Sequence, residues 1–122
     1  VLGKDTGRVQ LNQYIAGKGG NEKLAPVADG ADSGFNDYAF VWQKHSLRYY
    51  VNGALVHEVK DAAKLPTHAQ KIFLSLWGTD TLSDWMGRFA FAGPTRLEVE
   101  RLAFTAEGEP CQFDGSVACL VN

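Results

Sequence analysis

The sequence predicts an all-β fold, an antiparallel sandwich of which this chain forms one part. Apolar residues do not recur at helical spacing over any window of about 11 residues, except weakly near 61–65. Several segments instead alternate between apolar and polar residues, as half-buried strands do. Gly-rich and Asn-Gly turns separate these segments. The fold class follows from these three observations.

The N-terminal part is predicted to form two strands joined by a glycine-rich turn. Residues 9–14 alternate between an apolar face and a polar face. The polar face carries Gln10, Asn12 and Tyr14. After the turn at 17–20, residues 21–27 form the return strand, and residues 29–34 are a loop by composition.

A central meander of three strands is the strongest structural prediction. Residues 35–43 and 47–51 are rich in aromatic and β-branched residues, which favour strands. Asn52-Gly53 is the strongest short hairpin signal, and it precedes a third strand at 54–59. The meander is therefore expected to be antiparallel.

The C-terminal half is predicted to add two more strands. A helical turn at 61–66, ended by Pro66, comes first. Residues 71–77 alternate, and one face carries Phe73, Ser75 and Trp77. A long loop at 78–93 leads to a closing strand at 95–104.

Charge and hydropathy do not indicate a nucleic acid partner, an anionic membrane partner or a membrane-spanning helix. There are 12 basic and 14 acidic residues, so the net charge of −2 indicates neither a nucleic acid nor an anionic membrane as partner. No apolar run approaches the roughly 20 residues of a membrane-spanning helix, and no signal segment precedes the first strand. Because it opens on Val1 in a turn, we expect the chain to be part of a longer protein.

The two cysteines allow two interpretations. Cys111 and Cys119 are eight positions apart in a tail rich in Gly, Pro and Asp, a spacing that could close a small disulfide loop. The alternative is two free thiols, since local spacing does not fix the pairing. A disulfide would indicate an oxidising compartment, which means a secreted or periplasmic protein.

Two of the predicted strand faces suit the binding of sugars. The face at 10–14 and the face at 73–77 each combine aromatic rings with amide or hydroxyl groups. A pyranose offers apolar C–H faces to aromatic rings and a rim of hydroxyls to hydrogen-bonding groups. The alternative is that both faces are simply the second side of the sandwich.

Candidate catalytic carboxylates are scarce. Glycoside hydrolysis normally needs two carboxyl groups, and Glu98 and Glu100 are the only close pair inside a predicted strand, about 7 Å apart. Arg96 shares their face, so a solvated ladder of charges is the simpler explanation. Asp80 and Asp84 lie in a loop, where they are expected to cap turns. The histidines form no metal-binding motif; they are His45, His57 and His68.

Six segments, read in order, carry a family resemblance. They are Leu2-Gly-Lys-Asp-Thr, Val9-Gln-Leu-Asn-Gln-Tyr14, Gly19-Gly-Asn-Glu-Lys23, Phe35-Asn-Asp-Tyr-Ala-Phe-Val-Trp42, Tyr50-Val-Asn-Gly-Ala-Leu-Val-His57, and Ser75-Leu-Trp77 through Asp84-Trp-Met-Gly87. Together they resemble glycoside hydrolase family 16. The likeness is to its lichenase-like endo-β-1,3-1,4-glucanase branch and to the bacterial succinoglycan-type glycanases. It covers about residues 1–105, which we take as the C-terminal part of a family domain, with 106–122 as a cysteine-containing tail.

The resemblance implies a concanavalin A-like β-jelly roll, a β-glucan chain in its concave cleft and a retaining hydrolysis. The catalytic strand of such enzymes reads Glu-x-Asp-x-Glu and would fall immediately before Val1, so no catalytic residue is expected in this chain. We therefore expect the C-terminal part of a secreted endo-β-glucanase that is inactive alone. The alternatives are a β-glucan-binding module and an inert fragment. A complementary N-terminal half or a strand-swapped dimer would be its protein partner.

The resemblance also assigns roles to individual residues. Asn12 and Tyr14 match positions that contact the sugar, Trp77 matches a cleft tryptophan, and Ser75 stands where lichenases usually have Asn. Glu100 matches a ligand of a structural calcium, but the other ligands would lie outside this chain, so no metal or cofactor is expected here. The sequence departs from the family pattern at Asn21, Val41 and Tyr49, where His, Asp and Trp are usual.

Overall fold

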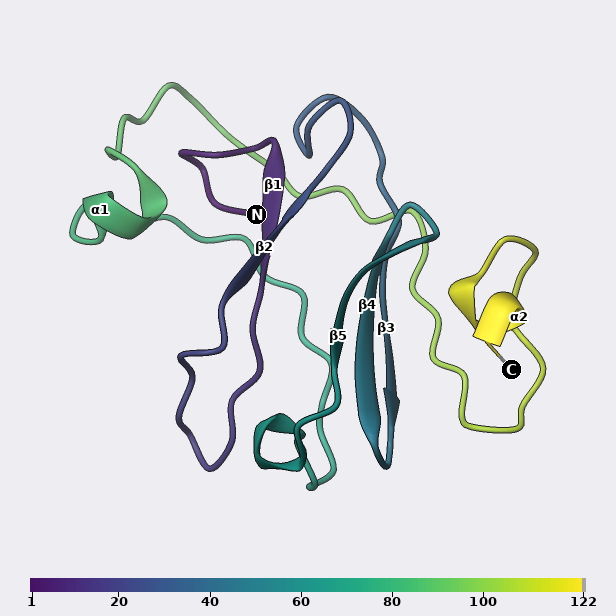
Figure 1. Ribbon diagram of the computed structural model, residues 1–122. Coiled ribbons are helices and arrows are strands. Elements are labelled where there is room, and N and C mark those ends of the chain that lie inside the picture. The colour runs from purple at the N-terminus through teal and green to yellow at the C-terminus, as the bar shows by residue number, and fades with distance from the viewer. Residues whose placement is uncertain (122) are drawn as a thin grey trace.

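The computed structural model describes residues 1–121, which form five antiparallel strands and three short helical segments. β1 (Arg8–Leu11) pairs with β2 (Lys23–Pro26), and a second sheet has the order β3-β4-β5. Its strands are β3 (Tyr38–Gln43), β4 (Ser46–Val51) and β5 (Ala54–Val59). Figure 1 shows the two sheets side by side. The predicted all-β, antiparallel class is confirmed.

The predicted central meander is also confirmed. β3 pairs with β4 without interruption from Gln43↔Ser46 to Tyr38↔Val51, and β5 follows β4 after a two-residue turn. In that turn Asn52 and Gly53 have φ values of 50° and 79°, the left-handed conformations that such hairpins need. The Asn52 side chain also accepts a 2.8 Å hydrogen bond from the Asp37 N–H, which anchors the start of β3.

The prediction of a strand over residues 9–14 is wrong at its C-terminal end, because β1 stops at Leu11. The backbone then turns tightly, with Ile15 and Lys18 exchanging N–H···O bonds of 2.9 and 3.0 Å. A side chain replaces the sheet ladder here, since Asn21 Nδ2 donates to the Gln13 carbonyl at 3.0 Å. The return strand is likewise shorter than 21–27.

The predicted strands at 71–77 and 95–104 are wrong. Within residues 1–121, no hydrogen bond between two backbone groups involves 66–81 or 88–105. A strand needs a neighbouring strand to pair with, and the described residues offer none to these segments. Their alternating apolar side chains stay exposed; Phe73 and Phe104, for example, are 81% and 72% exposed.

The helical segments are short. The predicted turn at 61–66 is confirmed as the 3-10 helix η1 (Ala62–Lys64), which Asp61 caps by accepting the Ala63 N–H at 3.0 Å. Two helices were not predicted: α1 (Ser83–Met86) in the long loop and α2 (Val117–Val121) in the tail. At four and five residues they are too short to show helical periodicity. No helix among residues 1–121 is long and apolar enough to cross a membrane.

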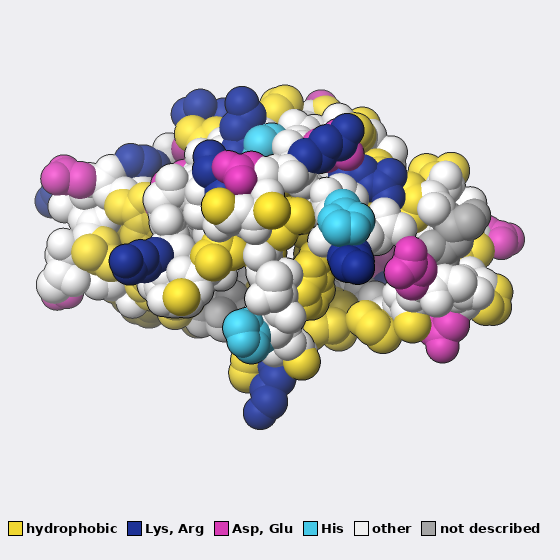
Figure 2. Space-filling model, turned by 60° about the horizontal axis from the view of Figure 1, so that its bottom comes forward, with side chains coloured by type: hydrophobic (Ala, Val, Ile, Leu, Met, Phe, Trp, Pro, Cys, Tyr) yellow, Lys and Arg dark blue, Asp and Glu magenta, His cyan; other side chains and the backbone are white. Residues whose placement is uncertain are grey.

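The buried core is small. Leu47, Val59 and Leu65 form one cluster, against which Tyr49 packs. Many other large apolar side chains reach the surface, and Figure 2 shows them gathered toward the lower edge of one face. The three-stranded sheet and η1 are therefore the part of the structure with the most complete packing.

Candidate functional site

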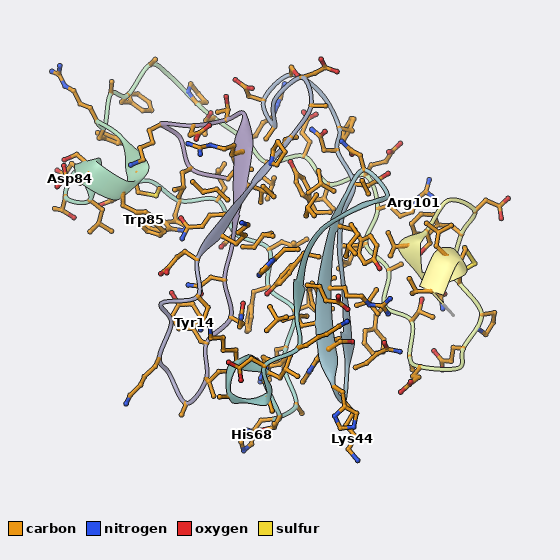
Figure 3. The ribbon with its side chains drawn as sticks, in the orientation of Figure 1. Tyr14, Lys44, His68, Asp84, Trp85 and Arg101 are labelled. Atoms are coloured by element: carbon orange, nitrogen blue, oxygen red, sulfur yellow. A yellow bond between two sulfur atoms is a disulfide. The ribbon has the colours of Figure 1, made fainter. Side chains whose placement is uncertain are left out.

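Two tryptophans and a glutamine form the centre of the candidate site. Trp77 and Trp85 are 53% and 42% exposed, and their ring centroids lie 6.2 Å apart at an interplanar angle of 45°. The Trp85 Nε1–H donates to Gln10 Oε1 at 2.9 Å. Figure 3 shows Trp85 extending from α1 toward the two-stranded sheet. The three side chains thus come from three segments far apart in the sequence.

The position of Trp85 depends on contacts between α1 and the N-terminal turn. The Lys4 N–H donates to the Met86 carbonyl at 3.0 Å, and the Lys4 ammonium donates to the Asp84 carbonyl. Gly87 ends the helix with a positive φ of 92° and lies directly against Lys4. These contacts hold α1 beside β1.

Asn12 and Tyr14 lie together in the loop after β1. The Asn12 carboxamide accepts the Asn21 N–H at 3.2 Å and donates to Glu22 at 3.4 Å. Tyr14 is 63% exposed, and its ring lies over Gly19, where an added Cβ would be only 2.7 Å from Tyr14 Cε1. Asn12 is therefore held by its neighbours, whereas Tyr14 presents a ring to solvent.

Tyr49 fixes this loop to the three-stranded sheet. Its hydroxyl lies 3.3 Å from both the Asn12 carbonyl and Gln13 Oε1, and it donates to one of these oxygens at a time. Gln13 is only 5% exposed, so its amide needs such a partner. The Tyr49 ring stacks on His57 with centroids 6.0 Å apart. Burial raises the pKa of Tyr49 above its usual value.

The raised pKa of Tyr49 predicts a loss of stability at high pH. The folded state favours the protonated phenol of Tyr49, because its pKa is higher there than in the unfolded chain. This contribution to the free energy of unfolding is complete below about pH 10 and is lost as pH rises through the folded-state pKa. Tyr49→Phe is expected to cost about 1 kcal/mol at neutral pH, through the lost hydrogen bond, and to make the alkaline decline shallower. Some decline should remain, because burial also raises the pKa of Tyr38. Urea denaturation between about pH 8 and pH 11 measures both effects, and equal declines in the two proteins would contradict this assignment.

The remaining predicted site residues do not join these groups. Ser75 is exposed in an extended segment. Glu98 forms an ion pair with Arg96, with 2.9 Å between Arg96 Nε and Glu98 Oε1. Both side chains are largely exposed, as expected of a solvated charge ladder. The two glutamates do not lie on a strand as predicted, so the shared face inferred from strand periodicity does not follow.

Glu100 is the residue for which the family resemblance implies a calcium role. Calcium takes six to eight oxygen ligands. Among residues 1–121, no three His, Cys, Asp or Glu side chains are grouped so as to hold a metal ion. The calcium role that the resemblance implies for Glu100 therefore stays a prediction about a longer protein.

The sequence predicts two polar strand faces that bind sugar, one at 10–14 and one at 73–77. In the structure only some residues of these two segments lie together. Trp77 meets Gln10 through Trp85, whereas no hydrogen bond or ring contact of the described residues links them to Asn12 or Tyr14. Trp85 was not singled out as a site residue. A second tryptophan soon after Trp77, in a loop of Gly, Thr, Ser and Asp, was the available signal.

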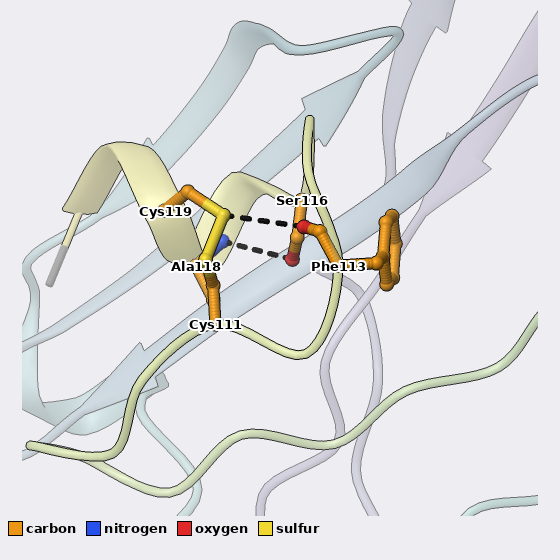
Figure 4. The surroundings of a disulfide bond; sticks show 5 residues. All are labelled: Cys111, Phe113, Ser116, Ala118 and Cys119. Atoms are coloured by element: carbon orange, nitrogen blue, oxygen red, sulfur yellow. Dashed lines mark hydrogen bonds between the residues drawn. A yellow bond between two sulfur atoms is a disulfide. The ribbon is translucent and has the colours of Figure 1, made fainter.

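A disulfide closes the C-terminal tail. Cys111 and Cys119 are bonded, and Figure 4 shows Cys119 Sγ beside the Phe113 carbonyl, 3.2 Å away. The Ser116 N–H donates to that same carbonyl at 3.1 Å. The Phe113 ring lies 4.2 Å below the Arg101 guanidinium, a cation–π contact that attaches the loop to the extended segment.

Comparisons with known proteins identify the family to which this chain is similar. The family model of glycosyl hydrolases family 16 matches residues 1–93. The chain is 67% identical to the endo-1,3-1,4-beta-glycanase ExoK of Rhizobium meliloti over 122 residues, all of this chain and 45% of that protein. It is 38% identical over 105 residues to a beta-glucanase of Paenibacillus macerans, covering 86% of this chain and 44% of the relative. It thus spans less than half the length of these relatives.

A solved structure shows the same fold. The Bacillus licheniformis beta-glucanase superposes with a TM-score of 0.70 at 35% identity, over 76% of this chain and 42% of that one. The fold is therefore part of the β-jelly roll of these enzymes. Since the family model covers most of the sequence, the chain belongs to glycosyl hydrolase family 16.

Proposed function

We propose that this chain supplies one wall of a β-glucan-binding cleft in a family 16 glucanase and does not hydrolyse glucan by itself. The observation that carries the proposal is the pair Trp77 and Trp85, half-exposed, in contact with each other and tied to Gln10. The names of the relatives, beta-glucanase and endo-1,3-1,4-beta-glycanase, support the substrate class.

Exposure alone does not distinguish these tryptophans, because many apolar side chains of this chain are exposed. What distinguishes them is chemistry. Two tilted rings offer faces to the C–H groups of successive sugar units, and the Gln10 amide, which uses Oε1 for Trp85, keeps its NH₂ donors for a hydroxyl. Tyr14 adds an exposed ring on the loop that follows β1.

The proposed lack of activity rests on the carboxylates. A retaining glycosidase holds two carboxyl groups about 5 to 5.5 Å apart on either side of the scissile bond. Glu22 is engaged with Asn12, Asp84 lies on the helix that carries Trp85, and the sequence holds no Glu-x-Asp-x-Glu run of the kind that the family resemblance implies for the catalytic strand. A working pair would have to come from outside this chain.

Affinity electrophoresis tests the binding. The chain is expected to be retarded in gels containing barley β-glucan or lichenan, and Trp77→Ala is expected to abolish the retardation, because it removes one of the two stacking rings. Phe104→Ala is the control, since it deletes an aromatic ring elsewhere that is even more exposed, 72% against 53% for Trp77, and should leave the retardation unchanged. Free migration of the unsubstituted chain would remove the binding proposal.

A reducing-sugar assay tests the lack of activity. With this chain alone, barley β-glucan and lichenan should release no reducing ends above the rate without protein. Clear turnover would overturn this part of the proposal, and Glu98→Gln and Glu100→Gln would then show whether that pair is responsible.

The disulfide supports a proposed location in an oxidising compartment, which for a bacterial glycanase means secretion or the periplasm. A protein from a reducing compartment would keep both thiols free. Thiol titration of unfolded protein, isolated under alkylating conditions from its natural host, distinguishes the two.

A further inference from the structure

The turn between β4 and β5 holds the pair Asn52-Gly53, and no other asparagine of this chain precedes a glycine. In such a pair the backbone nitrogen of the glycine can attack the side-chain carbonyl carbon of the asparagine, because glycine has no side chain to block the approach. The space beside Gly53 is open, since a Cβ there would meet nothing within 4 Å. Among residues 1–121 the Gly53 N–H has no hydrogen-bond partner. The attacking nitrogen of the pair is therefore free.

The side chain that would be attacked is held at both ends. Asn52 Oδ1 accepts the Asp37 N–H at 2.8 Å, and Asn52 Nδ2 donates to Asn36 Oδ1 at 2.9 Å. Asn36 is itself fixed, since its Nδ2 donates to the carbonyls of Gly30 and Gly34 at 3.3 and 3.2 Å. The Asn52 N–H also donates to the Asp37 carbonyl at 2.8 Å. While these bonds last, the amide carbon cannot turn toward the nitrogen of the next residue.

We propose that Asn52 is a modification site, at which the chain deamidates spontaneously whenever this turn opens. The Gly53 nitrogen gives up its proton to water or hydroxide and bonds to Asn52 Cγ. The bond from Cγ to Nδ2 breaks, Nδ2 takes up a proton and leaves as ammonia, and a succinimide ring remains. Water opens the ring at either of its carbonyls and leaves aspartate or isoaspartate, with one new negative charge. The bonds to residues 36 and 37 set how often the reaction starts, because it proceeds only from the open turn.

The two products have different consequences for the hairpin. Aspartate at position 52 keeps an oxygen for the Asp37 N–H but loses the donor to Asn36 Oδ1. Isoaspartate routes the backbone through the former side chain and adds a carbon atom to the two-residue turn that the pairing of Val51 with Ala54 closes. That pairing is therefore lost in the isoaspartate form. The proposal does not depend on glucan binding, because it concerns the turn of the sheet alone.

Mass spectrometry of tryptic peptides, after incubation of the chain in mildly alkaline buffer, measures the reaction. Trypsin releases residues 49–60, in which Asn52 is the only amide side chain. Conversion should be at least about tenfold slower in native buffer than in guanidinium chloride, because the denaturant removes the bonds to residues 36 and 37. Labelling by an isoaspartyl methyltransferase should identify isoaspartate in the product. Equal rates would overturn the protection by the fold, and an unchanged Asn52 in denaturant would overturn the modification site itself.

Two substitutions at Asn36 separate its bond to Asn52 from its other contacts. Asn36→Ala and Asn36→Asp both remove the donor to the Gly30 and Gly34 carbonyls, but only alanine also removes the acceptor for Asn52 Nδ2. In native buffer Asn36→Ala should deamidate about tenfold faster than the unsubstituted chain, whereas Asn36→Asp should stay within about twofold of it. Each rate is divided by the rate of the same variant in denaturant, which cancels the effect of the new charge on the chemistry. Equal acceleration by both variants would contradict the role of Asn36 in holding the Asn52 amide.

Discussion

Leu47→Ala is expected to unfold the three-stranded sheet. Leu47 is 4% exposed and contacts Val59 and Leu65, in the single apolar cluster of the sheet. Replacing a buried leucine with alanine costs about 2 to 5 kcal/mol, because the transfer free energy is lost and a cavity remains. Whole domains are stable by only about 5 to 15 kcal/mol, and just eight apolar residues among 1–121 are buried. The loss therefore consumes most of the stability of this chain.

Urea denaturation, followed by circular dichroism, measures the loss as a lower midpoint. Leu76→Ala is the matched control, since Leu76 is 52% exposed and its truncation should change the free energy of unfolding by no more than about 0.5 kcal/mol. Equal midpoints for the two variants would show that the sheet does not depend on this cluster.

The meander could be predicted because its signals are local. Alternation sets the strand faces, and Asn52-Gly53 sets the turn, so the pairing of β3, β4 and β5 can be predicted from residues 35–59. Residues 71–77 and 95–104 alternate just as clearly. They form no strands, because pairing is a long-range property that alternation cannot supply. The end of β1 was predicted three residues too late for a related reason. The Asn21 side chain, which is distant in sequence, donates a hydrogen bond to the Gln13 carbonyl in place of a strand partner.

The candidate site also has a part that the sequence predicts and a part that it does not. Trp77 could be selected from its strand-like pattern and from the family resemblance. Its partners could not, because the Trp85 bond to Gln10 joins α1 to β1 across most of the chain, and α1 itself is too short to show a helical pattern. The nearness of Asn12 and Tyr14 was foreseeable only as a shared strand face, and in the structure both side chains lie beside Gly19 in a tight loop.

Gly87→Ala is expected to weaken glucan binding strongly without unfolding the sheet. Gly87 has a φ of 92° and a ψ of 167°. Residues other than glycine adopt this backbone conformation only at a cost of about 1 to 3 kcal/mol. A Cβ there would lie 2.7 Å from the Lys4 Cβ and 3.2 Å from its Cα, and that backbone cannot retreat without breaking the Lys4 bond to Met86. The helix α1 must therefore shift and carry Trp85 away from Gln10.

The loss of a tryptophan anchor costs binding about 2 kcal/mol or more, which is about a thirtyfold weaker affinity. Retardation at graded concentrations of β-glucan measures it. Gly34→Ala is the control, because a Cβ at Gly34 meets nothing within 4 Å and the backbone there needs no left-handed conformation. The urea midpoint of the sheet should be nearly the same in both variants, since Gly87 lies outside β3, β4 and β5.

A double substitution decides whether Gly87 acts through Trp85. If its only effect on binding is to position that ring, Gly87→Ala should weaken binding about thirtyfold in the natural sequence and hardly at all in a Trp85→Ala background. Additive losses would mean that the turn at Lys4 and Gly87 affects the glucan surface by another route. The interpretation of Trp85 as the link between α1 and the β1 face would then be wrong, even though its hydrogen bond to Gln10 would stand.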